Sequence, residues 1–245
     1  MSTKSSLDYY SKNKQKLMKQ FEYSLKIAKD LLNERFNESK SEGLINQIRK
    51  EYEDILTNMT DVGGKRNFFI TILTSKVSLL AIFRILENEG YTYREIGEFN
   101  NKFTEIETKK AMERAEKRGM NLLDLYFSDP FINSLKKHCI DSHKRKYPDS
   151  WVMEFLEGTD EDFDYGFKVS ECGILKAYKK LSAEKYAPFA CLIDFAQANV
   201  MGFGLSRTQS LANGASECDH RYTRISTTPK AWPPDKFKEY TKKFE

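Results

Sequence analysis

The sequence predicts an α+β protein in which a helical N-terminal half packs on a C-terminal antiparallel sheet with helices on one face. Through roughly the first 145 residues, apolar side chains recur at three- and four-residue steps, as in amphipathic helices. From residue 147 onward, short stretches alternate apolar and polar side chains, as strands do. The order strand, strand, helix, helix, strand, strand predicts one antiparallel sheet.

Helical periodicity defines the elements of the first half. One helix is expected over residues 8–36 and a second over 41–59, each with its apolar side chains on one stripe. Residues 67–88 are apolar nearly all round, which predicts a central helix enclosed by other elements. Lys76 and Arg84 interrupt this run, and isolated charges are expensive in lipid, so we expect a buried helix and no membrane span.

Capping signals begin two further helices. Thr92 and Glu95 have the spacing of a capping box. Ser128 precedes Pro130, which suits a first helical turn, and the helix that they begin is expected to end near Lys146.

The C-terminal half is expected to hold four strands, over residues 151–156, 163–170, 203–211 and 218–225. Helices are expected over 173–181 and 188–201. We therefore divide the chain into a helical region (1–146), an α+β small-molecule-pocket region (147–227) and a surface tail (228–245) rich in proline and lysine, which together can form one integrated domain.

Composition narrows the class of protein. The net charge is only +4, which argues against nucleic acid as the main partner. The densest basic patch, 143–146, is interpreted as a helix end, where cations complement the helix dipole and need no ligand. The four cysteines form no C-x-x-C pair and the first residues lack a secretory apolar segment, so we expect reduced thiols in a cytoplasmic protein.

Two carboxylates lie in apolar surroundings. If the alternation of the second strand continues, Glu171 faces a core or a pocket; if the strand ends at Ser170, Glu171 is a solvated cap residue. Asp194 sits in an apolar helix, three residues after Cys191 and on the same face. A carboxylate in so apolar a neighbourhood requires a cation or several donors.

Arg207 is a candidate partner for these carboxylates because it lies in a stretch that alternates with apolar residues. Its two-pronged donor face can grip Glu171, Asp194 or the carboxylate of a substrate. The alternative is an internal structural ion pair.

Cys218 and His220 share one face of the last expected strand, while Asp219 and Arg221 share the other. A thiol beside an imidazole can act as nucleophile and base, although a buried cysteine also serves as a small apolar side chain. Convergence of Cys172, Cys191 and Cys218 would alternatively suit a soft metal with a fourth ligand such as Glu171 or His220, but nothing in their spacing requires it.

At this point a family resemblance becomes visible over most of the chain. The residues that carry it are Tyr9-Tyr10, 62–67, Tyr147-Pro148, Trp151-Val152, 163–166, 171–173, 191–194, 204–208, and Gly214 four residues before Cys218-Asp219. The chain resembles the L-2-amino-thiazoline-4-carboxylic acid hydrolase family. The family usually continues Cys-Asp with Phe-Arg, whereas this chain has His220-Arg221, so the Cys218/His220 pair is not a general family feature.

The C-terminal third also resembles the small-molecule-binding domains of the 4-vinyl reductase type, which carry Gly-x-x-x-Cys before the last strand. That likeness implies a sheet curled around a ligand pocket. Relatives of this type hold zinc through a Glu-x-x-Cys pair, but Arg207 and Ser210 occupy those places here, so no metal and no cofactor are expected.

The hydrolase resemblance implies attack of water on a carbon flanked by nitrogen and sulfur, which opens a cyclic isothiourea to a carbamoyl-cysteine. Either Cys218 attacks this carbon covalently or a carboxylate activates water directly. We assign Cys218 as nucleophile, Glu171 or Asp194 as proton carrier, and Arg207 or Arg221 as carboxylate clamp. Further substrate contacts are expected from Cys172, Asp219 and His220. All of these groups are expected to converge around one enclosed pocket.

The leading hypothesis is thus a cytoplasmic hydrolase of a small carbon-nitrogen or carbon-sulfur compound, with no nucleic-acid or membrane partner. One alternative is a small-molecule-binding or sensory module without catalysis, and another is a thioester- or amide-processing enzyme on the same scaffold. The sequence leaves open whether the chain forms a homo-oligomer.

Overall fold

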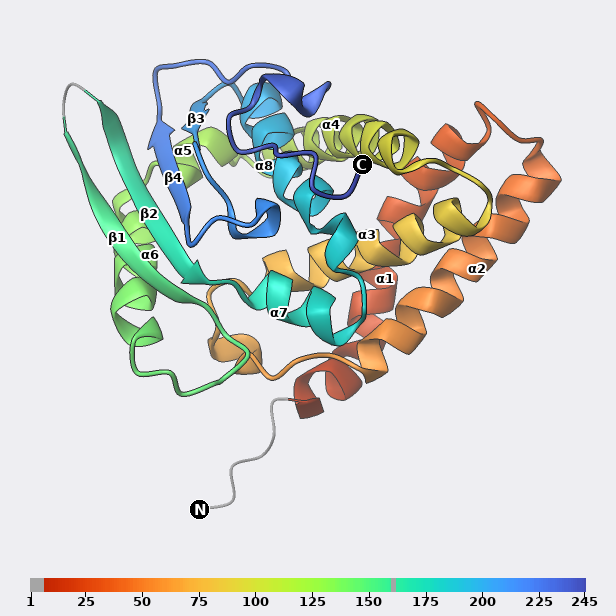
Figure 1. Ribbon diagram of the computed structural model, residues 1–245, viewed down its shortest axis with the longest axis horizontal. Coiled ribbons are helices and arrows are strands. Elements are labelled where there is room, and N and C mark those ends of the chain that lie inside the picture. Colours follow the sequence, from red (N-terminus) through yellow and green to blue (C-terminus); the bar gives the residue numbers. More distant parts are fainter. Residues whose placement is uncertain (1–6, 160–161) are drawn as a thin grey trace.

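Long helices form the first layer of the molecule (Figure 1). The computed structural model describes residues 7–159 and 162–245. A hairpin of α1 (Leu7–Leu32) and α2 (Glu38–Thr57) comes first, and the Asn37 side chain caps α2 by accepting a hydrogen bond from the Lys40 N–H at 2.9 Å. The two helices confirm the stripes predicted from the sequence.

The central helix is α3 (Ile70–Asn88), which is buried along most of its length, as its apolar composition predicts. It packs against α2, α4 and α7. The Thr92 capping box is present at the start of α4 (Tyr93–Glu116), and α4 packs closely on α8 (Ala187–Met201). Neither α3 nor any other helix of the described ranges combines the length and apolar character needed to cross a membrane.

Two shorter helices connect the helical layer to the sheet. They are α5 (Leu122–Tyr126) and α6 (Asp129–Ser142), and α6 begins at the predicted Ser128 cap and packs on β1. The expectation that this helix continues to residue 146 is wrong. Arg145 has a left-handed backbone (φ 46°), which a helix cannot continue, so the basic patch follows the end of the helix.

The sheet contains four antiparallel strands in the order β1-β2-β4-β3 (Figure 1). The strands are β1 (Val152–Thr159), β2 (Phe163–Glu171), β3 (Gly204–Ser206) and β4 (Cys218–Thr223). The pairs Phe167↔His220 and Val169↔Cys218 fix the register of β2 and β4.

The strand expected over residues 203–211 is only three residues long. After Ser206, the Thr208 and Gln209 N–H groups donate to the Asp219 carboxylate at 2.8 and 3.0 Å. The side chain of Asp219 therefore takes the place of a sheet partner, and the chain leaves the ladder.

Two helices, α7 (Gly173–Lys180) and α8, separate β2 from β3, as predicted. The surface extension expected from residue 228 onward is not what the structure shows. Thr228, Phe237, Glu239 and Tyr240 are buried, and Thr228 Oγ1 bridges the Phe203 carbonyl and the Leu205 N–H, each at 2.7 Å. In Figure 1 this last segment crosses the region of α8 and α4.

Candidate active site

Asp194 lies between two buried cations. Lys76 Nζ, from the central helix, is 3.1 Å from Asp194 Oδ1, and Arg207 Nη1 is 2.9 Å from Asp194 Oδ2. The side chains of Lys76 and Arg207 are 5% and 1% exposed, whereas Asp194 keeps 29% of its side-chain surface accessible. Asp194 is therefore the most accessible charged group of this trio.

The surroundings keep Asp194 ionised. Burial alone raises the pKa of a carboxyl group, but here the charges of Lys76 and Arg207 overcome that effect and hold the pKa of Asp194 well below its usual range. His220 Nε2 lies 3.8 Å from Asp194 Oδ2. At any ordinary pH, Asp194 is an anion with little tendency to take up a proton.

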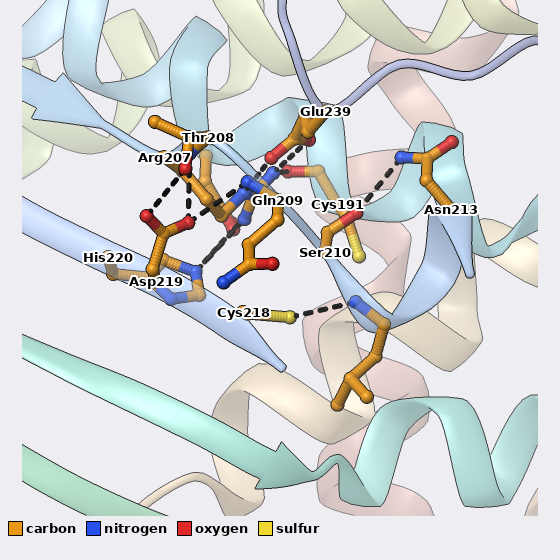
Figure 2. A network of polar contacts seen from close by, with 12 residues as sticks. Cys191, Arg207, Thr208, Gln209, Ser210, Asn213, Cys218, Asp219, His220 and Glu239 are labelled. Carbon is orange, nitrogen blue, oxygen red and sulfur yellow. Dashed lines mark hydrogen bonds and ion pairs between the residues drawn. The ribbon is translucent and has the colours of Figure 1, made fainter. Parts of the chain in front are cut away.

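Arg207 is saturated with acceptors (Figure 2). Its Nε and one Nη2 N–H donate to the two carboxylate oxygens of Glu239, and the Nη2 contact measures 2.8 Å. Its second Nη2 N–H donates to the Cys191 carbonyl at 3.1 Å, while Nη1 is 2.9 Å from both Asp194 Oδ2 and His220 Nε2. A guanidinium has five N–H groups, and these contacts use all five, so none is left for a substrate carboxylate.

Glu239 was not anticipated by the sequence analysis. Its side chain is 0% exposed, and it comes from the C-terminal segment that was expected on the surface. The signal that could have found it is the pair Phe237 and Tyr240, two aromatic residues that flank this carboxylate and are themselves buried.

From the sequence, Lys76 was noted only as a charge that interrupts the apolar run of the central helix. Its ammonium donates to the Ala190 carbonyl and to Asp194. A lone charge in the middle of an apolar helix requires a buried partner, and here that partner is Asp194.

His220 is a neutral ring in this site. Because Arg207 Nη1 donates to Nε2, the proton is assigned to Nδ1, which has no hydrogen-bond partner among the described residues. Burial lowers the pKa of His220 below its usual value. The ring stacks on Phe167, with centroids 4.5 Å apart.

Three thiols border this cluster and influence one another electrostatically. Burial raises the pKa of Cys172 to about 11 and the pKa values of Cys191 and Cys218 to about 12. Cys218 Sγ accepts the Leu211 N–H at 3.2 Å, and no contact recorded for the described residues joins it to His220. The described ranges contain no group of three or more His, Cys, Asp or Glu side chains placed to hold a metal ion.

Glu171 does not join the cluster. It lies at the end of β2, and its carboxylate forms ion pairs with Arg145 and Lys176. Hydrogen bonds from Lys176 and Arg145 lower the pKa of Glu171. Of the two positions considered from the sequence, the structure shows the residue at the strand end, paired with surface cations.

Asp219 and Arg221 lie on the face of β4 opposite His220. Asp219 accepts the Thr208 hydroxyl at 2.8 Å in addition to the two backbone N–H groups that end β3, and Arg221 Nη1 donates to it at 2.9 Å. These contacts hold the loop after β3, and Arg221 lies over the Phe163 ring. The structure thus brings together Cys172, Cys191, Asp194, Arg207, Cys218 and His220, and separates them from Glu171, Asp219 and Arg221.

A cavity of about 380 Å³ lies between the N-terminal helices and α8, and none of the residues of this cluster lines it. Hydroxyl groups from α3 line one wall, and Tyr126 of α5 and Gln197 of α8 also line the cavity. Burial and, to a smaller extent, the Asp194 charge raise the pKa of Tyr126.

The fold and this site define an α+β protein with a buried charge cluster between its helical layer and its sheet. The model of the L-2-amino-thiazoline-4-carboxylic acid hydrolase family matches residues 74–222. The chain belongs to this family. Comparisons with curated proteins and with solved structures gave no match.

Proposed function

We propose that the protein hydrolyses a small cyclic amidine-like compound that carries a carboxylate, such as a 2-amino-thiazoline carboxylate. Membership of the hydrolase family supports the class of reaction. The observation that carries the proposal is the ionised, partly accessible Asp194 beside Lys76, because the two form an anion-cation pair that matches a substrate with both charges.

The reaction requires one water molecule. Its oxygen bonds to the carbon flanked by nitrogen and sulfur, and the ring carbon-sulfur bond breaks. From the protonated amidine, whose ring nitrogen already carries a proton, one proton of the water goes to the departing sulfur and the other is released to solvent, so that the product is a carbamoyl-cysteine with a free thiol. The protein therefore has to orient the amidine and to provide a path for one proton.

In this proposal Asp194 binds the protonated amidine through its N–H groups. Because Lys76 and Arg207 keep its pKa low, the carboxylate stays charged and does not accept the proton of the bound cation. A fork of two N–H groups facing a carboxylate is the arrangement of strong, directional ion pairs.

Lys76 is the proposed contact for the substrate carboxylate. Its ammonium has three N–H groups, and the recorded contacts use two of them, to Ala190 and Asp194. Arg207, which the sequence suggested for this role, supports Asp194 instead because all its donors are occupied.

The thiols favour direct attack by water. Cys172, Cys191 and Cys218 all have pKa values raised to about 11 or 12 by burial, so each is protonated at neutral pH. Covalent attack by Cys218 would need a base within hydrogen-bond reach, and its recorded contact is a backbone donor.

The experiment compares Asp194→Asn and Cys218→Ser by mass spectrometry of the carbamoyl-cysteine product. Loss of a charged contact to the substrate is expected to lower kcat/KM at least about a hundredfold in Asp194→Asn. Turnover of Cys218→Ser is expected to stay near that of the unmodified protein. Asp54→Asn, on the exposed face of α2, is the matched control.

Two results would count against this scheme. Loss of turnover in Cys218→Ser, with the fold retained by circular dichroism, would establish the covalent route. Turnover by Asp194→Asn equal to that of Asp54→Asn would remove Asp194 from the mechanism.

A binding module without catalysis is the second candidate. The saturation of Arg207 and the protonated thiols favour it, because both describe a site in which few groups are free to react. Stoichiometric binding of the thiazoline in calorimetry, without product after prolonged incubation, would support this candidate over the hydrolase.

A further inference from the structure

A second cavity, of about 310 Å³, lies on the molecule between the loop after α2 and the loop after α6. Four cations line it, against one carboxylate: Arg66, Lys144, Arg145 and Lys146, with Asp141. These residues come from two segments that are far apart in sequence, so the end of helix α6 explains only part of the charge.

Two of the four cations have no carboxylate partner in the described ranges. Lys144 is paired with Asp141 and Arg145 with Glu171, but none of the ion pairs there involves Arg66 or Lys146. Both approach the same ring, since Arg66 Nη1 is 3.5 Å from the Tyr147 hydroxyl and Lys146 Nζ is 5.7 Å from the centre of the Tyr147 ring. Like charges gathered at one place repel each other, and an anion relieves that repulsion.

The cavity wall is firmly built. Asn67 Nδ2 donates to the Ser150 hydroxyl at 2.8 Å and to the Val62 carbonyl at 2.7 Å, which joins the two segments. The Tyr147 ring packs on Gly63, where an added Cβ would lie 2.5 Å from a ring carbon, and Gly63 has a left-handed φ of 95°. Only glycine fits this position without displacing the ring.

Arg145 adds a strained backbone to this cavity. Its φ of 46° lies in the left-handed region that non-glycine residues rarely adopt. Such strain concentrates at ligand-binding sites, where the surrounding structure holds it in place. His138, on the same wall, has an Nε2 atom for which the described residues offer no hydrogen-bond partner.

We propose that this cavity binds a small anion of the phosphate-monoester type. A group with two negative charges and three acceptor oxygens matches several converging cations better than a single carboxylate does. Arg66 supplies a planar fork of donors and Lys146 a point charge, from opposite segments of the cavity. The site is separate from the Asp194 cluster, so anion binding in this cavity can be tested independently of the hydrolase activity.

Binding of glycerol 3-phosphate and of inorganic phosphate to the full-length protein is measured by titration calorimetry at low salt. Saturable binding is expected, with affinity falling as salt is added. Arg66→Ala and Lys146→Ala are each expected to weaken it by about tenfold or more, because each removes a charged hydrogen bond.

Lys65→Ala is the matched control, since Lys65 is an exposed cation next to Arg66 that does not line the cavity. It should bind as the unmodified protein does. Three results would overturn the proposal: no saturable binding at millimolar phosphate, equal weakening by Lys65→Ala and Arg66→Ala, or tighter binding of the tricarboxylate citrate than of either phosphate compound.

Discussion

Two arginine-glutamate pairs of this protein share their chemistry and differ in their surroundings. Arg207 and Glu239 are 1% and 0% exposed, and the guanidinium has every donor occupied. Arg145 and Glu171 are 61% and 28% exposed, and Arg145 lines the basic cavity. In the buried pair, water cannot replace a lost partner, so Arg207 and Glu239 need each other. In the exposed pair, water can solvate both groups, so Arg145 can release Glu171 and bind another anion.

The largest expected effect comes from breaking the buried pair. Glu239→Gln leaves Arg207 charged and buried with one carboxylate fewer, which is expected to cost about 3–5 kcal/mol of unfolding free energy. Urea unfolding followed by circular dichroism measures it. A loss below about 1 kcal/mol would show that water reaches the pair and that its burial is not the deciding factor.

Asp194→Asn is expected to lower the unfolding free energy by less than Glu239→Gln does, by about 2–3 kcal/mol. Asp194 is partly exposed, so water can partly replace the lost charge as a partner of Lys76 and Arg207. Its pKa is lowered by folding, so its stabilisation is complete above its unfolded value of about 3.8 and is lost as the pH falls below that value. The difference in unfolding free energy between the unmodified protein and Asp194→Asn, measured by urea unfolding, should therefore be constant from pH 5 to 7 and decrease toward pH 3. A constant gap over the whole range would contradict this assignment.

His220→Phe tests the neutral ring. Because folding lowers the pKa of His220, the unfolded chain binds a proton below about 6.5 that the folded chain excludes, so stability falls as the pH drops through that value. The expected slope from this group is at most about 1.4 kcal/mol per pH unit. The variant keeps an aromatic ring against Phe167 and should show a shallower slope between pH 7 and 5; an unchanged slope would mean that the ring is charged when folded.

The smallest effect is expected at the surface pair. Glu171→Gln should change the unfolding free energy by about 1 kcal/mol or less, and less still at high salt. The same variant should strengthen phosphate binding at the basic cavity, because it frees Arg145. Titration calorimetry of phosphate binding to the unmodified protein and to Glu171→Gln measures this difference. Weaker binding by the variant would show that Glu171 orients Arg145 for the anion.

The fold was predictable where local patterns decide it. The stripes of α1 and α2, the Thr92 and Ser128 caps and the alternation of β2 all act between residues near in sequence. The alternation also placed Cys218 and His220 on the face opposite Asp219. The failures, at the ends of α6 and β3 and in the C-terminal tail, arose where a left-handed residue, a side-chain acceptor or distant packing intervened.

The candidate site was predictable only as a set of residue types. The sequence indicated that Asp194 and Arg207 need buried partners, but it offered Glu171 and Asp194 equally as partners of Arg207. It gave Lys76 no role beyond interrupting an apolar run, and it placed Glu239 on the surface. Pairing of charges depends on which segments pack together. Because Glu171 lies at the end of β2, it pairs with Arg145 and Lys176 and does not reach the Asp194 cluster.

By itself, the sequence determined the α+β class, the family and the faces of most elements, because periodicity and capping act over a few residues. Only the tertiary structure decided that Lys76, Asp194, Arg207 and Glu239 form one row of alternating charges. These residues are joined across as many as 118 positions of the chain, and their pairing and burial exist only once the helices and the sheet have closed around them.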